Sequence, residues 1–343
     1  MKISDFDYQL PDELIAQEPL DERQTSRMMV VNRSSGTMED RMFADLPDLL
    51  TAGDVLVVNN TKVFPARLFG KSETGANVEI FLVRELEDQV WESLARPARR
   101  LPPGKCIYFD QDLSAEVIDR VPDGKLVIRF DVTGRFEDVL ERIGRTPLPP
   151  YIKRGDGRLE QDRTRYQTVY AKERGSIAAP TAGLHFTDDV IAGIRARGIE
   201  IIEITLHVGY GTFEPVRVDD LAEHRVSPEN YEIDEKSARS LARAAAERRR
   251  IVAVGTTTTR ALESCVARKG RIVAGRGTAD LTITPGYEFK AVNSVLTNFH
   301  LPKSSLLILV STFAGRELIM KAYEHAVAER YRFYSYGDCM FIV

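Results

Sequence analysis

The stretch Gly175–Thr187 reads G-S-I-A-A-P-T-A-G-L-H-F-T and surrounds one histidine, His185, with small residues and a proline. Small side chains let a ligand approach the backbone closely, and Gly183 can take φ values that are closed to other residues. The hydroxyl of Thr181 and the free N–H groups of a helix expected after Thr187 supply hydrogen-bond donors at the same place. This stretch therefore predicts one wall of an active site.

A second candidate site lies in Val252–Arg260, which reads V-A-V-G-T-T-T-T-R. A buried strand ends here in Gly255, and a run of hydroxyls leads into a helix expected from Arg260. Such a turn gathers unpaired N–H groups and the positive end of a helix dipole, which suits a carboxylate or a phosphate. The alternative is an ordinary strand–helix turn capped by threonine, but four threonines exceed what one cap needs. The run matches neither a Walker loop nor a G-x-G-x-x-G fingerprint.

Three further segments carry polar or aromatic side chains beside turn residues. His207–Phe213 reads H-V-G-Y-G-T-F, in which the spaced glycines either admit a planar or charged ligand or form a tight structural turn. Asn298–Ser305 places an amide, an imidazole and an ammonium group before the apolar run Leu306–Phe313, which predicts a buried strand. Tyr331–Asp338 is rich in aromatics, which either stack on a base or fill a core.

The composition is that of a cytoplasmic protein with no general attraction to polyanions. Net charge is −4, and the three cysteines are scattered, which argues against a disulfide framework or a zinc ribbon. The five histidines show no metal-binding spacing, and we expect no membrane span. Local basic clusters either form a solvated face or contact phosphates. Those that predict a contact with RNA are Arg96, Arg99, Arg100, Lys153, Arg154, Arg163 and Arg165.

The spacing of strands and helices predicts an α/β protein with a second, all-β domain. Residues 63–150 contain about six short β-rich runs separated by turn signals, which is typical of a small antiparallel barrel. Residues 151–343 alternate strands with helices, so a layered α/β main domain is expected, completed by residues 1–62. The barrel is therefore interpreted as an insertion into the main domain.

The same stretches resemble the S-adenosylmethionine:tRNA ribosyltransferase-isomerases of queuosine biosynthesis, and the resemblance runs from end to end. The motifs that carry it are P-A-R-L-F-G at 65–70, R-Y-Q-T-V-Y-A at 165–171, A-A-P-T-A-G-L-H-F-T at 178–187, A-V-G-T-T at 253–257 and T-N-F-H-L-P-K-S at 297–304. The resemblance implies the same fold, an α/β body with an inserted barrel.

The resemblance also implies a reaction. The ribosyl part of S-adenosylmethionine moves to 7-aminomethyl-7-deazaguanine at the wobble position of a tRNA and rearranges to epoxyqueuosine, while adenine and methionine leave. S-adenosylmethionine is then a consumed co-substrate, and no cofactor or metal is expected. The partners are that tRNA and S-adenosylmethionine, and we expect a monomer.

Such chemistry needs a base that removes an acidic proton beside the sulfonium, and histidine suits neutral pH. His185 or His300 is the predicted base, with Asp338 as the next candidate, and Thr256, Thr257 and Arg260 are predicted to hold the methionine carboxylate. The remaining predicted substrate-binding residues are Thr181, Gly183, His207, Gly209, Gly211, Thr212, Asn298, Lys303 and Tyr336.

Two positions depart from the family pattern. Where members read H-x-M-H-x-E, this chain has His224-Arg225-Val226-Ser227-Pro228-Glu229, so the second histidine is Ser227. Lys62 stands where the family favours arginine. A member that binds tRNA or a nucleotide but has altered catalysis is therefore the alternative function. A methyltransferase is a weaker alternative, because its glycine-rich nucleotide loop is missing.

Overall fold

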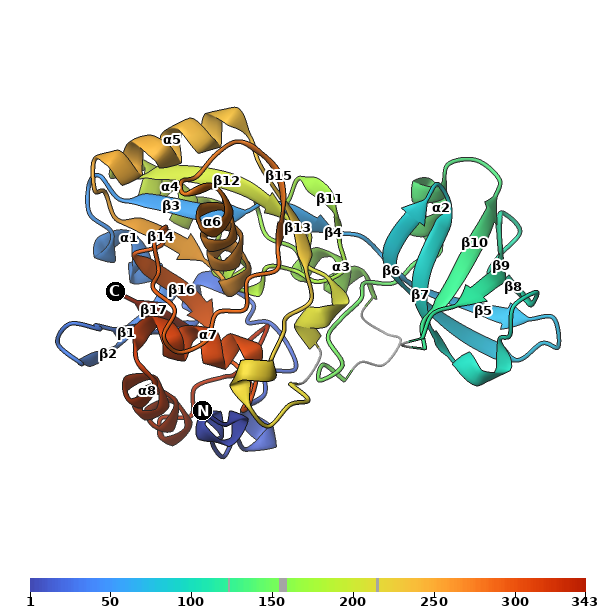
Figure 1. The fold of residues 1–343 in the computed structure, drawn as a ribbon, viewed down its shortest axis with the longest axis horizontal. Helices are drawn as coiled ribbons and strands as arrows, with labels where there is room; N and C mark the ends of the chain where they lie inside the picture. The colour runs from blue at the N-terminus through green and yellow to red at the C-terminus, as the bar shows by residue number, and fades with distance from the viewer. Residues whose placement is uncertain (123, 154–158, 214–215) are drawn as a thin grey trace.

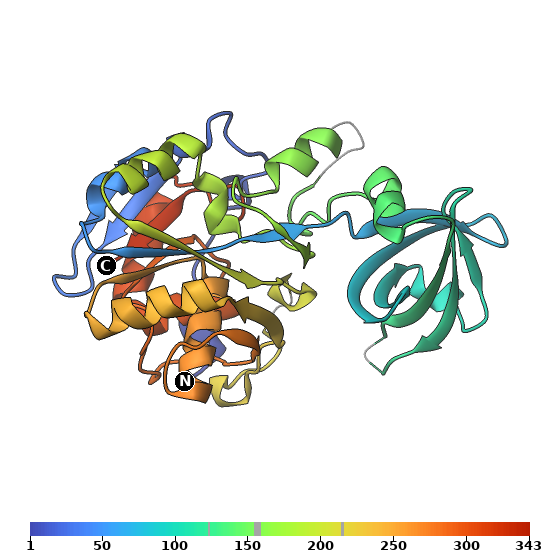
Figure 2. The same ribbon diagram turned by 90° about the horizontal axis from the view of Figure 1, so that it is seen from above.

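The computed structural model describes residues 1–122, 124–153, 159–213 and 216–343. Figures 1 and 2 both show an α/β body that contains the two chain termini and, beside it, a smaller barrel. The chain passes from the body into the barrel after β4 (Thr61–Val63) and has returned to the body by β11 (Glu173–Ser176). These two short strands pair in parallel, so the segments that lead to and from the barrel meet the body at one place.

A nine-stranded mixed sheet forms the centre of the body, in the order β15-β13-β12-β3-β14-β16-β17-β1-β2. Its four central strands, β12, β3, β14 and β16, are parallel to one another, whereas β17 is antiparallel to β16. The bounds are β1 Arg27–Val31, β2 Met38–Met42, β3 Val55–Asn59, β12 Glu200–Leu206, β13 Glu229–Ile233, β14 Ile251–Val254, β15 Gly275–Ala279, β16 Ser294–Asn298 and β17 Cys339–Ile342.

Helices cover both faces of this sheet, as the buried runs of its central strands require. Ile251 and Ala253 of β14 pack in one core cluster, and Val252 and Val254 pack in the cluster on the opposite face. Residues of α5, α6, α7 and α8 belong to the first cluster, and residues of α1 and α4 belong to the second. The bounds are α1 Leu46–Leu49, α4 Asp188–Ala196, α5 Glu235–Ala246, α6 Thr256–Lys269, α7 Ser305–Ala314 and α8 Arg316–Ala328.

The predicted barrel is present and closed, with six antiparallel strands in the order β10-β7-β6-β5-β8-β9. Alternate residues such as Leu68, Ile80 and Val117 point inward and are fully buried. Two helices follow the barrel strands, α2 (Phe136–Ile143), which packs against the barrel core, and α3 (Leu159–Arg165). The strand bounds are β5 Arg67–Ser72, β6 Asn77–Glu87, β7 Val90–Arg96, β8 Cys106–Tyr108, β9 Leu113–Arg120 and β10 Leu126–Val132.

Two predictions of local structure are wrong. Leu306–Phe313 is helix α7 and not a strand, because a short apolar run fits a buried helix as well as a buried strand. The deciding signal is Ser304, whose side chain accepts a hydrogen bond from the Leu307 N–H and caps the helix. Helix α6 begins at Thr256, four residues before the predicted Arg260, so the threonine run forms its first turn.

One buried carboxylate ties α6 to the loop that leads into β16. Glu263 is fully buried, and its oxygens accept hydrogen bonds from the Tyr287 hydroxyl at 2.8 Å and from three successive backbone N–H groups. Those backbone donors belong to Lys290, Ala291 and Val292, which directly precede β16. The carboxylate therefore fixes α6 relative to β16, and both elements reach the cavity described below.

Replacing Glu263 by glutamine should lower the free energy of unfolding by roughly 1–3 kcal/mol, because an amide N–H₂ would then face backbone N–H donors. Urea unfolding at neutral pH measures the change. Glu235→Gln on the exposed surface of α5 is the matched control, with an expected change within about 0.5 kcal/mol. Equal stability of the Glu263 variant and the wild type would contradict this role.

Candidate functional site

The carboxyl ends of the four parallel strands meet at one edge of the body sheet. The loop after β14 begins with Gly255, the loop after β16 contains His300, and the loop after β12 contains His207. Because β17 runs antiparallel to β16, the residues that precede it, including Tyr334, arrive at the same edge. Ligands bind at such an edge in open α/β sheets. The predicted segments therefore converge as a consequence of strand direction.

A cavity of about 600 Å³ opens at this edge, within the range of small-molecule sites. All five predicted segments contribute to its walls, and most of the wall is apolar or aromatic. The predicted site residues that line it are Thr181, Thr212, Thr256, Thr257, Asn298, His300 and Lys303. The aromatic and small apolar residues around them include Tyr151, Tyr166, Ala178, Ala179, Ala182, Phe299 and Tyr334.

The N-terminus of α6 faces this cavity without a side-chain cap. Gly255 is its N-cap residue, with φ +89°, and no side chain hydrogen-bonds to the first N–H groups of the helix. The hydroxyls of Thr258 and Thr259 donate back to the carbonyls of Val254 and Gly255. Thr256 and Thr257 instead line the cavity. The free N–H groups and the helix dipole thus favour an anion at this wall.

His300 lies in the cavity wall, directly after β16. Its Nε2 is 2.9 Å from the hydroxyl oxygen of Thr297, and its backbone N–H donates to the hydroxyl of Tyr323 at 2.9 Å. Burial lowers the pKa of His300 from 6.5 to about 3. The imidazole is therefore neutral at physiological pH.

His185 does not line this cavity but lies one side chain behind it. Its Nε2 is 3.2 Å from Oδ1 of Asn298, and its Nδ1 is 2.7 Å from the hydroxyl of Ser26. The amide N–H₂ of Asn298 donates to the carbonyls of Tyr334 and Ser335, which leaves Oδ1 to face the imidazole. Nε2 must then carry the proton. Because of burial, the pKa of His185 falls to about 4, so this ring is a neutral support for Asn298.

Four other predicted site residues have packing or hydrogen-bond partners away from the main cavity. Asp338 is buried and accepts hydrogen bonds from the backbone N–H groups of Arg27 and Arg332 at 2.9 and 2.8 Å, and burial raises its pKa. His207 Nδ1 is 2.8 Å from the Thr61 hydroxyl. The Gly209 N–H donates to Glu229, and Tyr336 lines a small crevice beside His185.

The reason for glycine at position 183 differs from the prediction. Gly183 does not have a positive φ, so its backbone does not require glycine. A Cβ atom there would lie 2.2 Å from the hydroxyl oxygen of Tyr170 and 2.8 Å from a methyl carbon of Thr168. The position therefore needs a small residue for packing within the protein.

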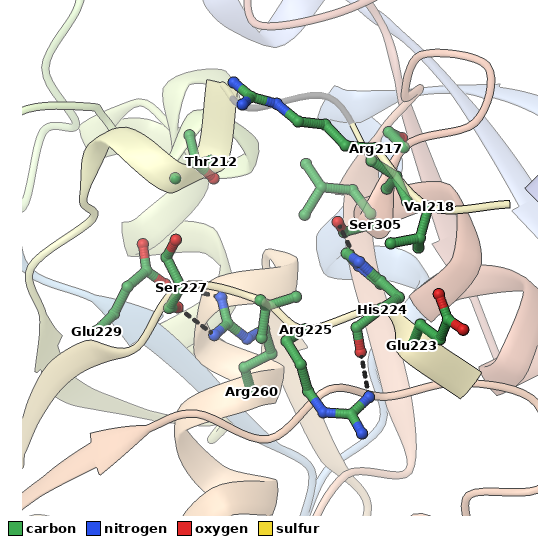
Figure 3. Close-up of a pocket in the computed structure, with 15 residues that line it drawn as sticks. Thr212, Arg217, Val218, Glu223, His224, Arg225, Ser227, Glu229, Arg260 and Ser305 are labelled. Carbon is green, nitrogen blue, oxygen red and sulfur yellow. Dashed lines mark hydrogen bonds and ion pairs between the residues drawn. The ribbon is translucent and has the colours of Figure 1, made fainter. Parts of the chain in front are cut away.

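A second, smaller cavity of about 330 Å³ adjoins the first, with which it shares the lining residues Thr212, Val216, Ser304 and Leu306 (Figure 3). Gly211 also lines it. Arg260 lies in its wall, where it pairs with buried Glu229 at 2.9 Å and donates to the carbonyls of Ser227 and Ala279. Burial raises the pKa of Glu229, although the ion pair acts in the opposite direction. His224 Nε2 is 2.8 Å from the Ser305 hydroxyl.

Comparison with known proteins places this geometry in a family. Residues 3–342 match the family model described as queuosine biosynthesis protein. The chain belongs to this family. Curated relatives from Syntrophotalea carbinolica and Desulfitobacterium hafniense, each named S-adenosylmethionine:tRNA ribosyltransferase-isomerase, are 50% identical over 345 residues and are covered in full, as is this chain. The crystal structure of S-adenosylmethionine tRNA ribosyltransferase from Thermotoga maritima is similar, with 37% identity, a TM-score of 0.57 and coverage of 99% of this chain and 100% of that one.

The departure from the family pattern at Ser227 falls in the second cavity and not in the first (Figure 3). Its backbone carbonyl accepts the hydrogen bond from Arg260, a contact that does not depend on the side chain. The serine thus lies outside the walls of the main cavity. Lys62, the other departure from the queuosine biosynthesis family, lies in β4 with an exposed side chain.

The basic residues predicted to contact tRNA fall into two groups. Arg96, Arg99 and Arg100 are exposed on the barrel, at the end of β7 and in the short helical turn Ala98–Arg100. Arg163 and Arg165 instead make contacts within the protein, the first with Glu141 and the second with the carbonyls of Leu20 and Asp21. Lys153 is exposed, and Arg154 lies outside the described residues.

Sequence reasoning missed two cavity residues in this family member, Tyr151 and Thr297. Tyr151 lines the main cavity and lies against Tyr334 of the predicted segment Tyr331–Asp338, with ring centroids 4.2 Å apart. The proline-rich exit before Tyr151 could have signalled a rigid wall, since prolines fix φ. Thr297, which contacts His300, lies within a strand that was not predicted.

No group of three or more His, Cys, Asp or Glu residues in the described ranges could hold a metal ion. In that same part of the chain, no helix combines the length and apolar character needed to cross a bilayer.

The buried, neutral state of His185 predicts a pH-dependent stability. The unfolded chain binds a proton at His185 near pH 6.5 and the folded chain only near pH 4, so this contribution is complete above pH 6.5 and is lost as pH falls toward 4. Between pH 7 and pH 4.5 the free energy of unfolding should fall in both proteins. The fall should be roughly 2 kcal/mol smaller for His185→Gln than for the wild type. Urea unfolding at the two pH values measures the difference, and equal losses in both proteins would contradict the prediction.

Proposed function

We propose that this protein is an S-adenosylmethionine:tRNA ribosyltransferase-isomerase. In this proposal it transfers the ribosyl part of S-adenosylmethionine to 7-aminomethyl-7-deazaguanine at the wobble position of tRNA, and epoxyqueuosine forms there as adenine and methionine leave. The observation that carries the proposal is the main cavity, because it joins an apolar, aromatic wall to an uncapped helix N-terminus. S-adenosylmethionine has the matching parts, an aromatic base at one end and a carboxylate at the other.

The two ends of the ligand fit different walls. The carboxylate of the methionine part is placed at the N-terminus of α6, where Thr256 and Thr257 add hydroxyls to the free N–H groups. The adenosine part is placed against the aromatic side that includes Tyr334 and Phe299. Arg260 is a less suitable carboxylate ligand than the sequence suggests, because Glu229 and two backbone carbonyls already bind its guanidinium group.

The proton beside the sulfonium needs an acceptor within the cavity. Of the three side chains predicted to be catalytic, His300 lines the cavity, whereas His185 and Asp338 do not. We assign the base to His300, which is neutral and held by Thr297. In this assignment His185 is a positioning residue that fixes Asn298, and Asp338 fixes the backbone at Arg27 and Arg332.

The proposed activity is tested by release of adenine. The purified chain should release adenine from S-adenosylmethionine when tRNA carries the 7-aminomethyl-7-deazaguanine base and should release none with tRNA that lacks it. Chromatography of the small-molecule products measures both. Tight tRNA binding without adenine release would support the alternative suggested by Ser227, a family member that binds tRNA but has altered catalysis. Transfer of a labelled methyl group to tRNA would instead indicate a methyltransferase.

The role of His300 is tested by His300→Gln, which keeps a polar side chain of similar reach. We expect turnover to fall about 10²- to 10⁴-fold, the usual loss on removing a general base, with S-adenosylmethionine affinity retained within about threefold. Calorimetric binding and adenine release measure the two quantities. His325→Gln is the matched control, because His325 lies on α8 beside Asp40 and does not line the cavity. Normal turnover of the His300 variant would remove His300 as the base.

A further inference from the structure

The outer face of the barrel carries an open groove of about 790 Å³ with exposed aromatic rings. Phe69 on β5 is 43% exposed and Tyr108 on β8 is 52% exposed. Tyr108 pairs across the strands with Lys71, two residues from Phe69, so all three side chains lie on the same face of the barrel. Flat apolar rings of this size are normally buried, so an exposed pair on one face indicates a binding surface.

Three basic side chains line the groove with these rings, and the two acidic side chains that also line it form ion pairs with arginines. Arg145 lies over the ring of Phe69, with its guanidinium carbon 4.4 Å from the ring centroid, and Lys71 and Arg96 also line the groove. Two carboxylates line it as well. Glu79 pairs with Arg67 at 3.2 Å and Asp110 pairs with Arg142 at 2.8 Å. The groove is thus locally cationic in a chain whose net charge is −4.

A small pocket between the barrel and the body shares lining residues with both the groove and the main cavity. Pro150 lines both the main cavity and this pocket. Glu79 and Arg96 line both the pocket and the groove. Within the pocket, Phe81 of the barrel contacts Tyr210 of the body, with ring centroids 5.7 Å apart. An RNA that runs from the main cavity past this pocket would meet a hollowed, cationic surface on the barrel.

We infer that this groove binds unpaired nucleotides of the RNA whose modified base enters the main cavity. Phe69 and Tyr108 stack on bases, and Arg96, Lys71 and Arg145 contact the phosphates of the same nucleotides. Unpaired nucleotides are favoured because a duplex hides the faces of its bases, whereas splayed bases stack on aromatic side chains. The inference rests on the proposed function, since it takes the RNA to be the tRNA substrate and the unpaired part to be its anticodon loop.

The test uses the full chain with both rings replaced, Phe69→Ala and Tyr108→Ala together. The dissociation constant for substrate tRNA should rise roughly ten- to a hundredfold, the effect of losing base stacking, while that for S-adenosylmethionine stays unchanged. Phe69→Leu with Tyr108→Leu should show a similar loss, because it keeps apolar surface without a flat ring. Leu86→Ala is the matched control, an exposed apolar residue of the same barrel that does not line the groove.

A second measurement identifies the part of the RNA that binds. An anticodon stem-loop should compete with tRNA for the wild-type protein, and a duplex of the same length should compete at least tenfold more weakly. If the double alanine variant binds tRNA like the wild type, or the leucine variant does, the inference is wrong while the proposed function stands. If the duplex competes equally, stacking is likewise excluded. If the wild type itself releases no adenine with precursor-bearing tRNA, the proposed function fails instead.

Discussion

The parallel pairing of β12, β3, β14 and β16 is the constraint on which the candidate site depends. Parallel strands end at the same edge of a sheet, so loops that are far apart along the chain must meet there. The antiparallel strand β17 adds the residues that precede it, which brings Tyr334 to the same edge. A cavity with an uncapped helix N-terminus and an aromatic wall follows from this arrangement.

Buried polar contacts keep that edge rigid. A buried polar group without a hydrogen-bond partner is strongly destabilising. A movement that broke one of these hydrogen bonds would leave such a group, so the bonds restrict how the neighbouring segments can move. Glu263 holds the start of β16 to α6, and the contact of His185 with Asn298 holds the end of the same strand against Tyr334 and Ser335. The cavity walls are thereby fixed before any ligand binds, which is the preorganisation that positioning a large substrate requires.

Much of the fold could be predicted from the sequence, because turn residues and alternating β-branched runs marked each of the six barrel strands. The segments that line the site were also predicted from local sequence, because glycines and polar residues mark their turns. The predictions that were wrong concern features that depend on tertiary contacts. Leu306–Phe313 is apolar except for Ser311 and Thr312, so its sequence does not distinguish a buried helix from a buried strand. His185 and His300 look alike in sequence, although only His300 lines the cavity. Phe69 and Tyr108 belong to ordinary strand patterns, so their exposure is visible only when the barrel is closed.

The barrel is inserted at the edge of the body sheet that carries the main cavity. Strand β3 lies in the middle of the sheet, and its carboxyl end continues through Asn60 into β4 and then into the barrel (Figure 1). The returning strand β11 pairs with β4 and leads directly to Ala178 and Ala179 in the cavity wall. A domain inserted at the carboxyl end of a central strand must emerge at the edge where ligands bind. The inserted barrel therefore begins at the same edge as the main cavity.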